Sequence, residues 1–376
     1  MNRLQQQQLT EKIQTSKIVL VSGPRLSGKE EMIAQALTDL QLEYLAMNLG
    51  NKKERKIIEE ADEATLIQTL SAYKYIVIHE AQYLSNLQTI IELVLSDSIS
   101  ASILLNCSFE PKMDDLLKEV LDTQGLHLKI YPPALYELTT HFGMAEESKL
   151  LEQRLINGNY PAVTLSPDAA QDILSHLLDT VLITDLGVTD RINKKQQLIK
   201  MLQTLAFFIG EPVSYNEVAT HAGIDNETVE RYIELLEKAY VLIRIPSYST
   251  EKRYELKKTH LIYFVDTGLR NMLINNFNPP SVRMDMDALW KNWLVSERVK
   301  WNAINNKQVN YWFWRTHTKQ TVEFIEEDEN KNKVGYKIAW DKKKKVKFPP
   351  MFGEYYPSIP TKVLNRTTYI TFLASK

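Results

Sequence analysis

The sequence is short of several features, and each absence narrows the classes of protein to consider. It contains a single cysteine, Cys107, so no disulfide can form within the chain and nothing indicates an oxidising compartment. No apolar run approaches the roughly 20 residues that a membrane-spanning helix needs. Residues 1–8 are polar and lack the apolar core of a secretory signal. We therefore expect a soluble protein of the cytoplasm.

No charge of one sign dominates either. The formal net charge is −2 over 376 residues, so no global field would attract nucleic acid or a membrane surface. The hydrophobic share of 44% and the charged share of 24% are those of an ordinary globular protein. At roughly 100–200 residues per domain, this length predicts two or three domains.

Short apolar segments alternate with helical segments in the first part of the chain. Such alternation predicts an α/β fold with helices on the faces of a parallel sheet. Helices then dominate from about residue 145 to residue 240. The strands expected in the first part are 17–21, 44–47, 75–78, 101–105 and 127–130. The helices expected there are 1–15, 30–40, 66–72 and 87–95.

A glycine-containing loop lies between the first strand and the helix that follows it. Its glycines let backbone N–H groups turn around a phosphate, and the start of the helix adds positive potential. The lysine that ends the loop adds a cation for the outer phosphates. Together these features predict a P-loop that binds ATP. The expected binding residues are Gly23, Pro24, Arg25, Leu26, Ser27, Gly28, Lys29, Glu30 and Glu31.

The residues that would hold Mg²⁺ are altered at two positions. A working P-loop has Ser or Thr after the lysine, whereas this chain has Glu30. The Glu30 carboxylate is an unusual Mg²⁺ ligand, a group that repels the phosphates, or an acidic first-turn residue that complements the helix dipole. The acid expected at the end of the third strand is His79, and a lone histidine there is usually structural. Binding of Mg²⁺ is therefore in doubt.

Two candidate catalytic side chains remain. Glu80 follows His79 and is placed to polarise an attacking water molecule. Asn106 follows the fourth expected strand and is placed to sense the γ-phosphate, although it is equally typical of a turn. We favour ATP binding with weak or lost hydrolysis, in a nucleotide-bound switch or scaffold. The alternative is an active ATPase with an unusual Mg²⁺ site.

Five segments carry a resemblance to a known family, namely 23–25, 79–82, 131–137, 158–161 and 262–270. On these segments the chain resembles prokaryotic AAA-superfamily ATPases that carry a C-terminal domain of unknown function 4143. The resemblance covers most of the chain. It implies an AAA-like P-loop core at 1–143, a helical lid or linker at 144–194, a winged-helix-like domain at 195–255 and a degenerate endonuclease-like domain at 256–376.

The residues that differ from this family's pattern stand at positions expected to take part in catalysis or metal binding. Leu126 stands where an arginine is usual and Thr184 where a basic residue is usual, in addition to the altered Mg²⁺ positions. One carboxylate cannot hold a catalytic Mg²⁺ well, so we expect no nuclease activity in the last domain. The residues that stand there for the Glu, Asp, Glu and Lys of a nuclease centre are Lys291, Glu323, Lys337 and Ala339.

Residues 198–254 follow the order of a winged helix-turn-helix. Ser214 and Glu217 form an expected capping box for its second helix, and Asp225 is expected to cap the third. Acids share one face of that third helix, which argues against DNA reading and favours a packing or protein-contact role. The acids are Glu227, Glu230, Glu234 and Glu237, against the basic Arg244, Lys252 and Arg253 of the wing.

Partners are indicated less directly. The basic run Lys342, Lys343, Lys344 and Lys345 is either a nucleic-acid contact, a contact for an acidic partner or a solvated loop. A nucleic-acid-binding module that needs no nucleotide is thus a further alternative. The resemblance implies a protein partner or an oligomer, with Arg191 as a guess for an arginine donated to a neighbour.

Overall fold

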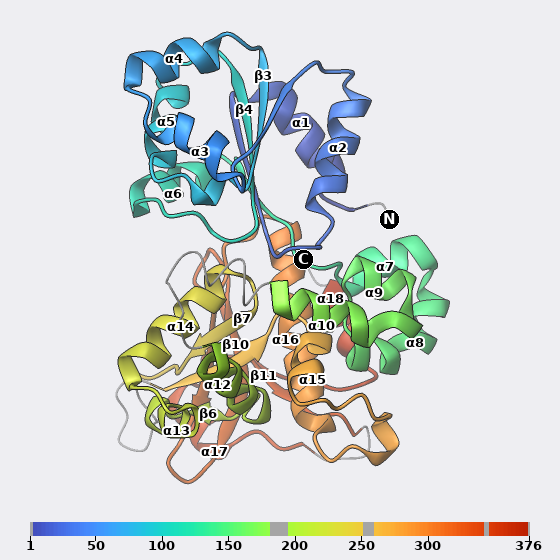
Figure 1. Ribbon diagram of the computed structural model, residues 1–376. Coiled ribbons are helices and arrows are strands. Elements are labelled where there is room, and N and C mark those ends of the chain that lie inside the picture. Colours follow the sequence, from blue (N-terminus) through green and yellow to red (C-terminus); the bar gives the residue numbers. More distant parts are fainter. Residues whose placement is uncertain (1–2, 181–194, 251–258, 342–345, 375–376) are drawn as a thin grey trace. The chain divides into compact units, whose positions relative to one another are not determined.

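The computed structural model describes residues 3–180, 195–250, 259–341 and 346–374 (Figure 1). The chain divides into two compact units, Met1–Pro132 and Pro133–Lys376. The finer boundaries expected at 143, 194 and 255 stay predictions. Within the four described stretches, no helix is both long enough and apolar enough to cross a membrane.

The first unit is built on a five-stranded sheet in which every pairing is parallel. The strand order is β2-β3-β4-β1-β5, so the α/β fold predicted from the sequence is confirmed. In a parallel sheet the carboxyl ends of the strands meet at one edge, where ligands bind. The strands are β1 Ile18–Ser22, β2 Leu45–Asn48, β3 Tyr75–His79, β4 Ser102–Cys107 and β5 His127–Lys129.

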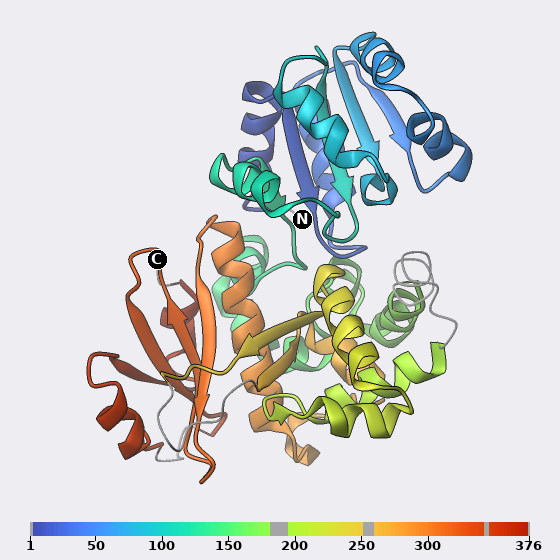
Figure 2. The same cartoon turned by 90° about the vertical axis from the view of Figure 1, so that its left-hand side faces the viewer.

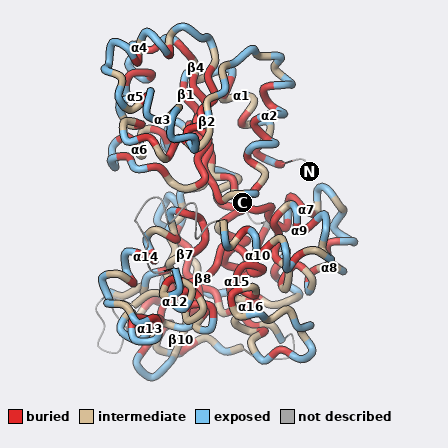
Figure 3. Tube along the Cα trace, viewed as in Figure 1, coloured by how far each residue is buried: buried red, intermediate tan, exposed pale blue. Residues whose placement is uncertain are grey.

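Helices cover both faces of this sheet, with α1 and α2 on one side and α3 to α6 on the other (Figure 1). Side chains alternate along β1, so that Val19 and Val21 pack toward α1 and α2 while Ile18 and Leu20 pack toward the other face. The strands form the buried centre of the unit (Figure 3). The helices are α1 Gln6–Thr15, α2 Lys29–Asp39, α3 Lys52–Glu59, α4 Glu63–Ser71, α5 Leu87–Leu95 and α6 Asp115–Thr123.

The second unit begins with a helical part and continues into a small antiparallel sheet. That sheet has the order β6-β8-β7 and is formed by β6 Pro212–Val213, β7 Leu242–Pro246 and β8 His260–Phe264. The helices before β8 are α7 Leu135–Phe142, α8 Met144–Asn157, α9 Pro161–Leu165, α10 Ala170–Thr180, α12 Lys195–Phe207, α13 Tyr215–Ala222 and α14 Asn226–Lys238.

The rest of this unit is organised around a long buried helix, α16 Met286–Ile304. It packs against a four-stranded sheet of order β12-β11-β10-β9 (Figure 2), and Trp290 and Trp293 stack on each other in the shared core. The strands are β9 Asn310–Arg315, β10 Thr321–Glu327, β11 Lys333–Ile338 and β12 Thr361–Leu364. The remaining helices are α15 Thr267–Leu273, α17 Pro350–Tyr355 and α18 Tyr369–Ala374.

Local signals within α13 and α14 were only partly correct. Asp225 caps α14 as predicted, since its carboxylate accepts a hydrogen bond of 2.7 Å from the Thr228 N–H. The capping box predicted for α13 is wrong, because the Ser214 side chain accepts no cap hydrogen bond. Gly223 ends α13 with φ of +70°, a conformation that suits glycine.

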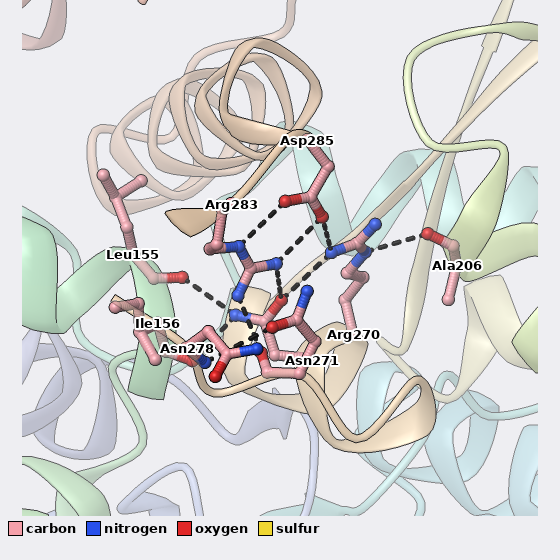
Figure 4. Close-up of polar contacts among 9 residues, drawn as sticks. Leu155, Ile156, Ala206, Arg270, Asn271, Asn278, Arg283 and Asp285 are labelled. Carbon is pink, nitrogen blue, oxygen red and sulfur yellow. Dashed lines mark hydrogen bonds and ion pairs between the residues drawn. The ribbon is translucent and has the colours of Figure 1, made fainter. Parts of the chain in front are cut away.

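A buried polar network joins separate segments of the second unit (Figure 4). Asp285 accepts hydrogen bonds from Arg283 and Arg270. Arg270 also donates to the carbonyl of Ala206, which lies 64 residues away in the sequence. Asn271 donates to the carbonyl of Ile156 at the end of α8. Burial alone would raise the pKa of Asp285, but the bonds from the two arginines lower it to about 2. This network holds α8, α12 and α15 together and is internally satisfied.

Candidate nucleotide-binding site

Glycine is required by the geometry of the loop between β1 and α2. A Cβ at Gly23 would lie 2.0 Å from the Ile130 carbonyl oxygen, so only a residue without a side chain fits. Gly28 has φ of +93° at the start of α2, a left-handed conformation that glycine adopts without strain. Pro24 is buried beside the strand ends, whereas Leu26 is exposed at the tip of the loop. The loop therefore has the close-approach backbone that a phosphate cradle needs.

Lys29, the first residue of α2, is folded back over this loop. Its Nζ donates to the carbonyl oxygens of Gly23 and Pro24 at 2.8 and 2.7 Å, and the side chain is buried. Burial lowers the pKa of Lys29 to about 8, although the nearby carboxylates of Glu80 and Glu30 act in the opposite direction. A buried cation with only carbonyl partners is the group that a phosphate would attract.

Ser27 supplies a second indication that the loop is built for a ligand. Its side chain is fully buried, yet its Oγ has no hydrogen-bond partner in the described part of the chain. A buried hydroxyl without a partner costs roughly 1–3 kcal/mol, which a ligand oxygen would recover. The Ser27 carbonyl is meanwhile held by the guanidinium of Arg3 at 2.6 Å.

Arg3 is a loop-positioning residue that sequence reasoning missed. It is buried and also donates to the Tyr131 carbonyl at 2.8 Å, which ties the loop after β1 to the segment after β5. A lone arginine in a polar, Gln-rich stretch carries no pattern that would have singled it out.

The end of β1 is fixed by a second unpredicted contact. Ser22 Oγ lies 2.7 Å from His127 Nε2, and His127 Nδ1 lies 3.0 Å from the Asp122 carboxylate. The sequence of groups is that of a serine hydrolase, but Ser22 is fully buried and no substrate can reach it. We assign these residues a structural role, joining β1 to β5 and α6.

Glu80, the predicted water-polarising residue, is fully engaged with its neighbours. Arg25 from the loop binds it with both arms of its guanidinium, at 2.8 Å to Oε1 and 2.9 Å to Oε2. Ser108 Oγ also donates to Oε1 at 3.0 Å, and Gln82 Nε2 donates to Oε2 at 2.6 Å. Glu80 has φ of +56°, a strained left-handed conformation that turns its side chain into this cluster.

His79 and Asn106 lie side by side at the ends of β3 and β4. They are direct partners in the strand register, and Asn106 Nδ2 lies 3.1 Å from His79 Nδ1. Because the amide nitrogen donates, His79 Nδ1 accepts and its ring proton is on Nε2. The turn alternative for Asn106 is wrong, since the residue lies inside β4, and its Oδ1 is a second buried atom without a partner in the described chain.

Nucleotide and metal fit this site unequally. Glu30 and Glu31 are exposed on the first turn of α2. His79 is bonded to Asn106, and Glu80 is occupied by Arg25. Across the described residues, no three His, Cys, Asp or Glu side chains are arranged to hold a metal. The phosphates of ATP fit the loop, whereas Mg²⁺ does not fit the residues around it.

A cluster of one carboxylate and two lysines lies in the second unit, at positions where the sequence resemblance led us to expect an altered nuclease centre. Lys337 Nζ on β11 lies 2.7 Å from Glu323 Oε1 on β10, and Lys291 Nζ on α16 lies 3.8 Å from the same oxygen. Lys337 also donates to the Thr321 carbonyl at 2.8 Å. Ala339 is buried just after β11. Two ammonium groups around one carboxylate would repel a divalent cation.

Several predicted contact residues lie outside the described part of the chain. They are the basic run Lys342, Lys343, Lys344 and Lys345, the wing residues Lys252 and Arg253, and Thr184 and Arg191. The acids of α14 are described, and Glu227, Glu230 and Glu234 are exposed on it. Glu237 instead pairs with Arg244 at 2.8 Å.

Comparison with known proteins gives one relative and several solved structures. An uncharacterized protein of Haemophilus influenzae is 24% identical over 288 residues, which are 71% of this chain and 72% of the relative. A Walker-type ATPase of Pyrococcus abyssi is 12% identical, over 72% of this chain and 94% of its own, with a TM-score of 0.43. The Holliday junction branch migration motor RuvB of Thermotoga maritima is 16% identical, over 65% of this chain and 90% of its own, with a TM-score of 0.34.

Family models match two segments of the chain. Residues 148–280 match a domain of unknown function (DUF8612). This match corrects the expected domain of unknown function 4143 in the C-terminal part. Residues 15–139 match the AAA domain, over the sheet and loop described above. This match supports the resemblance of the amino-terminal part to AAA-superfamily P-loop domains.

Proposed function

We propose that this protein binds ATP on the loop between β1 and α2 but hydrolyses it weakly or not at all. The nucleotide would then act as a switch or as a structural ligand. The observation that carries this proposal is the state of Glu80, whose two oxygens accept from Arg25, Ser108 and Gln82. A carboxylate has about four acceptor sites, and these bonds leave none for water.

The binding half of the proposal is supported by groups that await an anion. Lys29 is a buried cation, and Ser27 Oγ is a buried hydroxyl without a partner in the described chain. The start of α2 adds backbone N–H groups and positive potential at the same point. ATP would supply phosphate oxygens to all three, and Lys29 would hold the outer phosphates.

The hydrolysis half is supported by what surrounds the outer phosphates. Phosphoryl transfer depends on a bound metal, a positioned water and cations that stabilise the transition state. Glu30 and His79 stand in place of the metal ligands, and Arg25 covers the residue that would position water. The alternative, an active ATPase with an unusual Mg²⁺ site, needs Arg25 to leave and Glu30 to turn inward.

Calorimetry and a phosphate-release assay test this proposal together. We expect the wild type to bind ATP, Lys29→Ala to weaken binding by at least about 100-fold, and phosphate release to stay at the background rate. Lys53→Ala, at an exposed lysine on α3, is the matched control and should bind as the wild type does. Steady phosphate release that disappears in Glu80→Gln would establish the active ATPase instead.

For the second unit we infer a winged-helix-like segment at 195–255 and a degenerate endonuclease-like part at 256–376. The order α12-β6-α13-α14-β7 supports the first, and the convergence of Lys291, Glu323 and Lys337 supports the second. Exposed acids on α14 favour a protein partner over DNA at that helix. Salt-dependent DNA binding that is lost when Lys342 to Lys345 become Ala would favour the nucleic-acid alternative.

A further inference from the structure

The site poses a problem of charge that the proposed function leaves open. ATP carries several negative charges on its outer phosphates, and Mg²⁺ normally offsets part of them. Here the metal does not fit, and three carboxylates, those of Glu30, Glu31 and Glu80, lie close to the loop in sequence or space. Lys29 alone would have to hold the phosphates, although its burial already disfavours its charged form. A second cation is needed, and the loop contains one.

We propose that Arg25 is a phosphate-binding and specificity residue that exchanges Glu80 for the outermost phosphate, so that the site takes a nucleoside triphosphate without Mg²⁺. The inference rests on the proposed function and names the form of nucleotide that this site selects. Guanidinium binds carboxylate and phosphate through the same two-pronged geometry, so the exchange substitutes one anion for another.

The position of Arg25 supports this exchange. Lys29 Nζ is held by the carbonyls of Gly23 and Pro24, and Pro24 directly precedes Arg25, so both cations belong to one short loop. The Arg25 side chain is 19% exposed, so it is accessible from the solvent side. Its present partner, Glu80, occupies the position expected beside the γ-phosphate. The exchange therefore requires the Arg25 side chain to rotate from Glu80 toward a third phosphate held at the loop.

The partner that Arg25 would leave is not orphaned. Glu80 keeps the hydrogen bonds from Ser108 Oγ and Gln82 Nε2, one on each carboxylate oxygen. Gln82 is itself held in place, because its Oε1 accepts from the Ser108 N–H at 3.2 Å. The cluster of Glu80, Gln82 and Ser108 therefore survives the departure of the arginine. An unpaired buried carboxylate would oppose the exchange, and these two donors reduce that cost.

The test is calorimetry of ATP and ADP, each in EDTA and in Mg²⁺, on the wild type and on variants. We expect the wild-type Kd for ATP to agree within about twofold between the two conditions. Arg25→Ala should weaken ATP by about 10- to 100-fold and ADP by less than about threefold, and Arg25→Lys should recover part of the loss. Glu80→Gln removes the competing anion and should tighten ATP several-fold.

Arg55→Ala is the matched control. Arg55 resembles Arg25 in two respects, because its side chain is 17% exposed and both arginines contact Tyr83. Arg55 pairs with Glu59, however, and lies on α3, outside the loop. Arg55→Ala should leave the Kd of both ATP and ADP unchanged, and thermal melting should show that every variant is folded. ATP binding that needs Mg²⁺, or that Arg25→Ala leaves unchanged, overturns this inference while the proposed function stands. No ATP binding by the wild type or by Glu80→Gln overturns both.

Discussion

Glu80 in the first unit and Glu323 in the second each stand where the sequence resemblance led us to expect a catalytic carboxylate. Each is instead neutralised by cations of the same chain, Glu80 by Arg25 and Glu323 by Lys337 and Lys291. The difference lies in what carries the cation. Arg25 belongs to a loop, whereas Lys337 lies on β11 and Lys291 on α16.

That difference bears on whether the cation can leave its carboxylate for a ligand. Around Glu80 the glycines, the buried Lys29 and the unsatisfied Ser27 hydroxyl remain, and a ligand can compete for the loop arginine. Around Glu323 the lysines are anchored by regular structure, and Lys337 is also tied to the Thr321 carbonyl. A cation carried by a loop is compatible with ligand exchange, whereas cations carried by a strand and a helix favour a fixed structural contact.

The largest effect is expected from a substitution that disrupts the loop between β1 and α2. Gly23→Ala brings a Cβ to 2.0 Å from the Ile130 carbonyl, so the loop or the strand must move. We expect loss of ATP binding and destabilisation of the first unit by about 3 kcal/mol or more. Thermal melting and calorimetry measure the two effects. Gly353→Ala, where a Cβ meets nothing within 4 Å, should change neither, and an equal effect there would contradict the steric argument.

The two carboxylates should also differ when each is neutralised by substitution. Glu323→Gln leaves two ammonium groups, those of Lys337 and Lys291, beside one neutral amide, and we expect a loss of about 2 kcal/mol in unfolding free energy. Glu80→Gln leaves a single guanidinium, carried by a loop, and should cost less than about 1 kcal/mol because the amide oxygen can still accept from Ser108. Chemical denaturation of the two variants measures both values. Equal losses would remove the distinction between loop and sheet.

The sheet of the first unit was predictable because its strands are short, apolar and separated by helices. Two helices were missed. In α3 only Ile58 is buried and the rest is largely charged, so no apolar stripe marks it. In α6 the sequence does contain a helix-start signal, because Asp114 caps the helix, but this signal was not used in the prediction. Ser214 shows the reverse error, since a capping pattern was read where the side chain makes no such bond.

The candidate site also has a part that the sequence predicted and a part that it did not. The loop was predictable because the glycines, Lys29 and their place between strand and helix are local features. The pairing of Arg25 with Glu80 joins residues 55 apart, and the contact of Arg3 with Tyr131 joins residues 128 apart. Such contacts depend on the strand order, which brings the ends of β1, β3 and β5 together and which no local pattern states. The sequence therefore predicted the phosphate-binding loop, and only the fold revealed the contacts of Arg25 and Arg3 around it.

A pH titration sharpens the contrast between the two cations of the loop. In the free protein the pKa of Lys29 is about 8, and bound phosphates would raise it, so above that pH binding must take up a proton. We expect ATP affinity to be level below pH 8 and to fall by up to about tenfold per pH unit above it. Arg25 stays charged throughout this range. Calorimetry on Lys29→Arg should give a level profile, and a level wild-type profile would contradict the lowered pKa of Lys29 in the free protein.

The smallest effect concerns the acidic helix α14 of the second unit. Asp225 caps it through a 2.7 Å bond to the Thr228 N–H, whereas Ser214 at the start of α13 makes no equivalent bond. Asp225→Ala should therefore cost about 1 kcal/mol, and Ser214→Ala less than about 0.5 kcal/mol. Denaturation midpoints at equal slope measure the pair. Neither change touches the loop of the first unit, so ATP affinity should stay constant in both. A shift in affinity would mean that α14 influences the nucleotide site, and the second unit would then be a reader of the nucleotide rather than a fixed support.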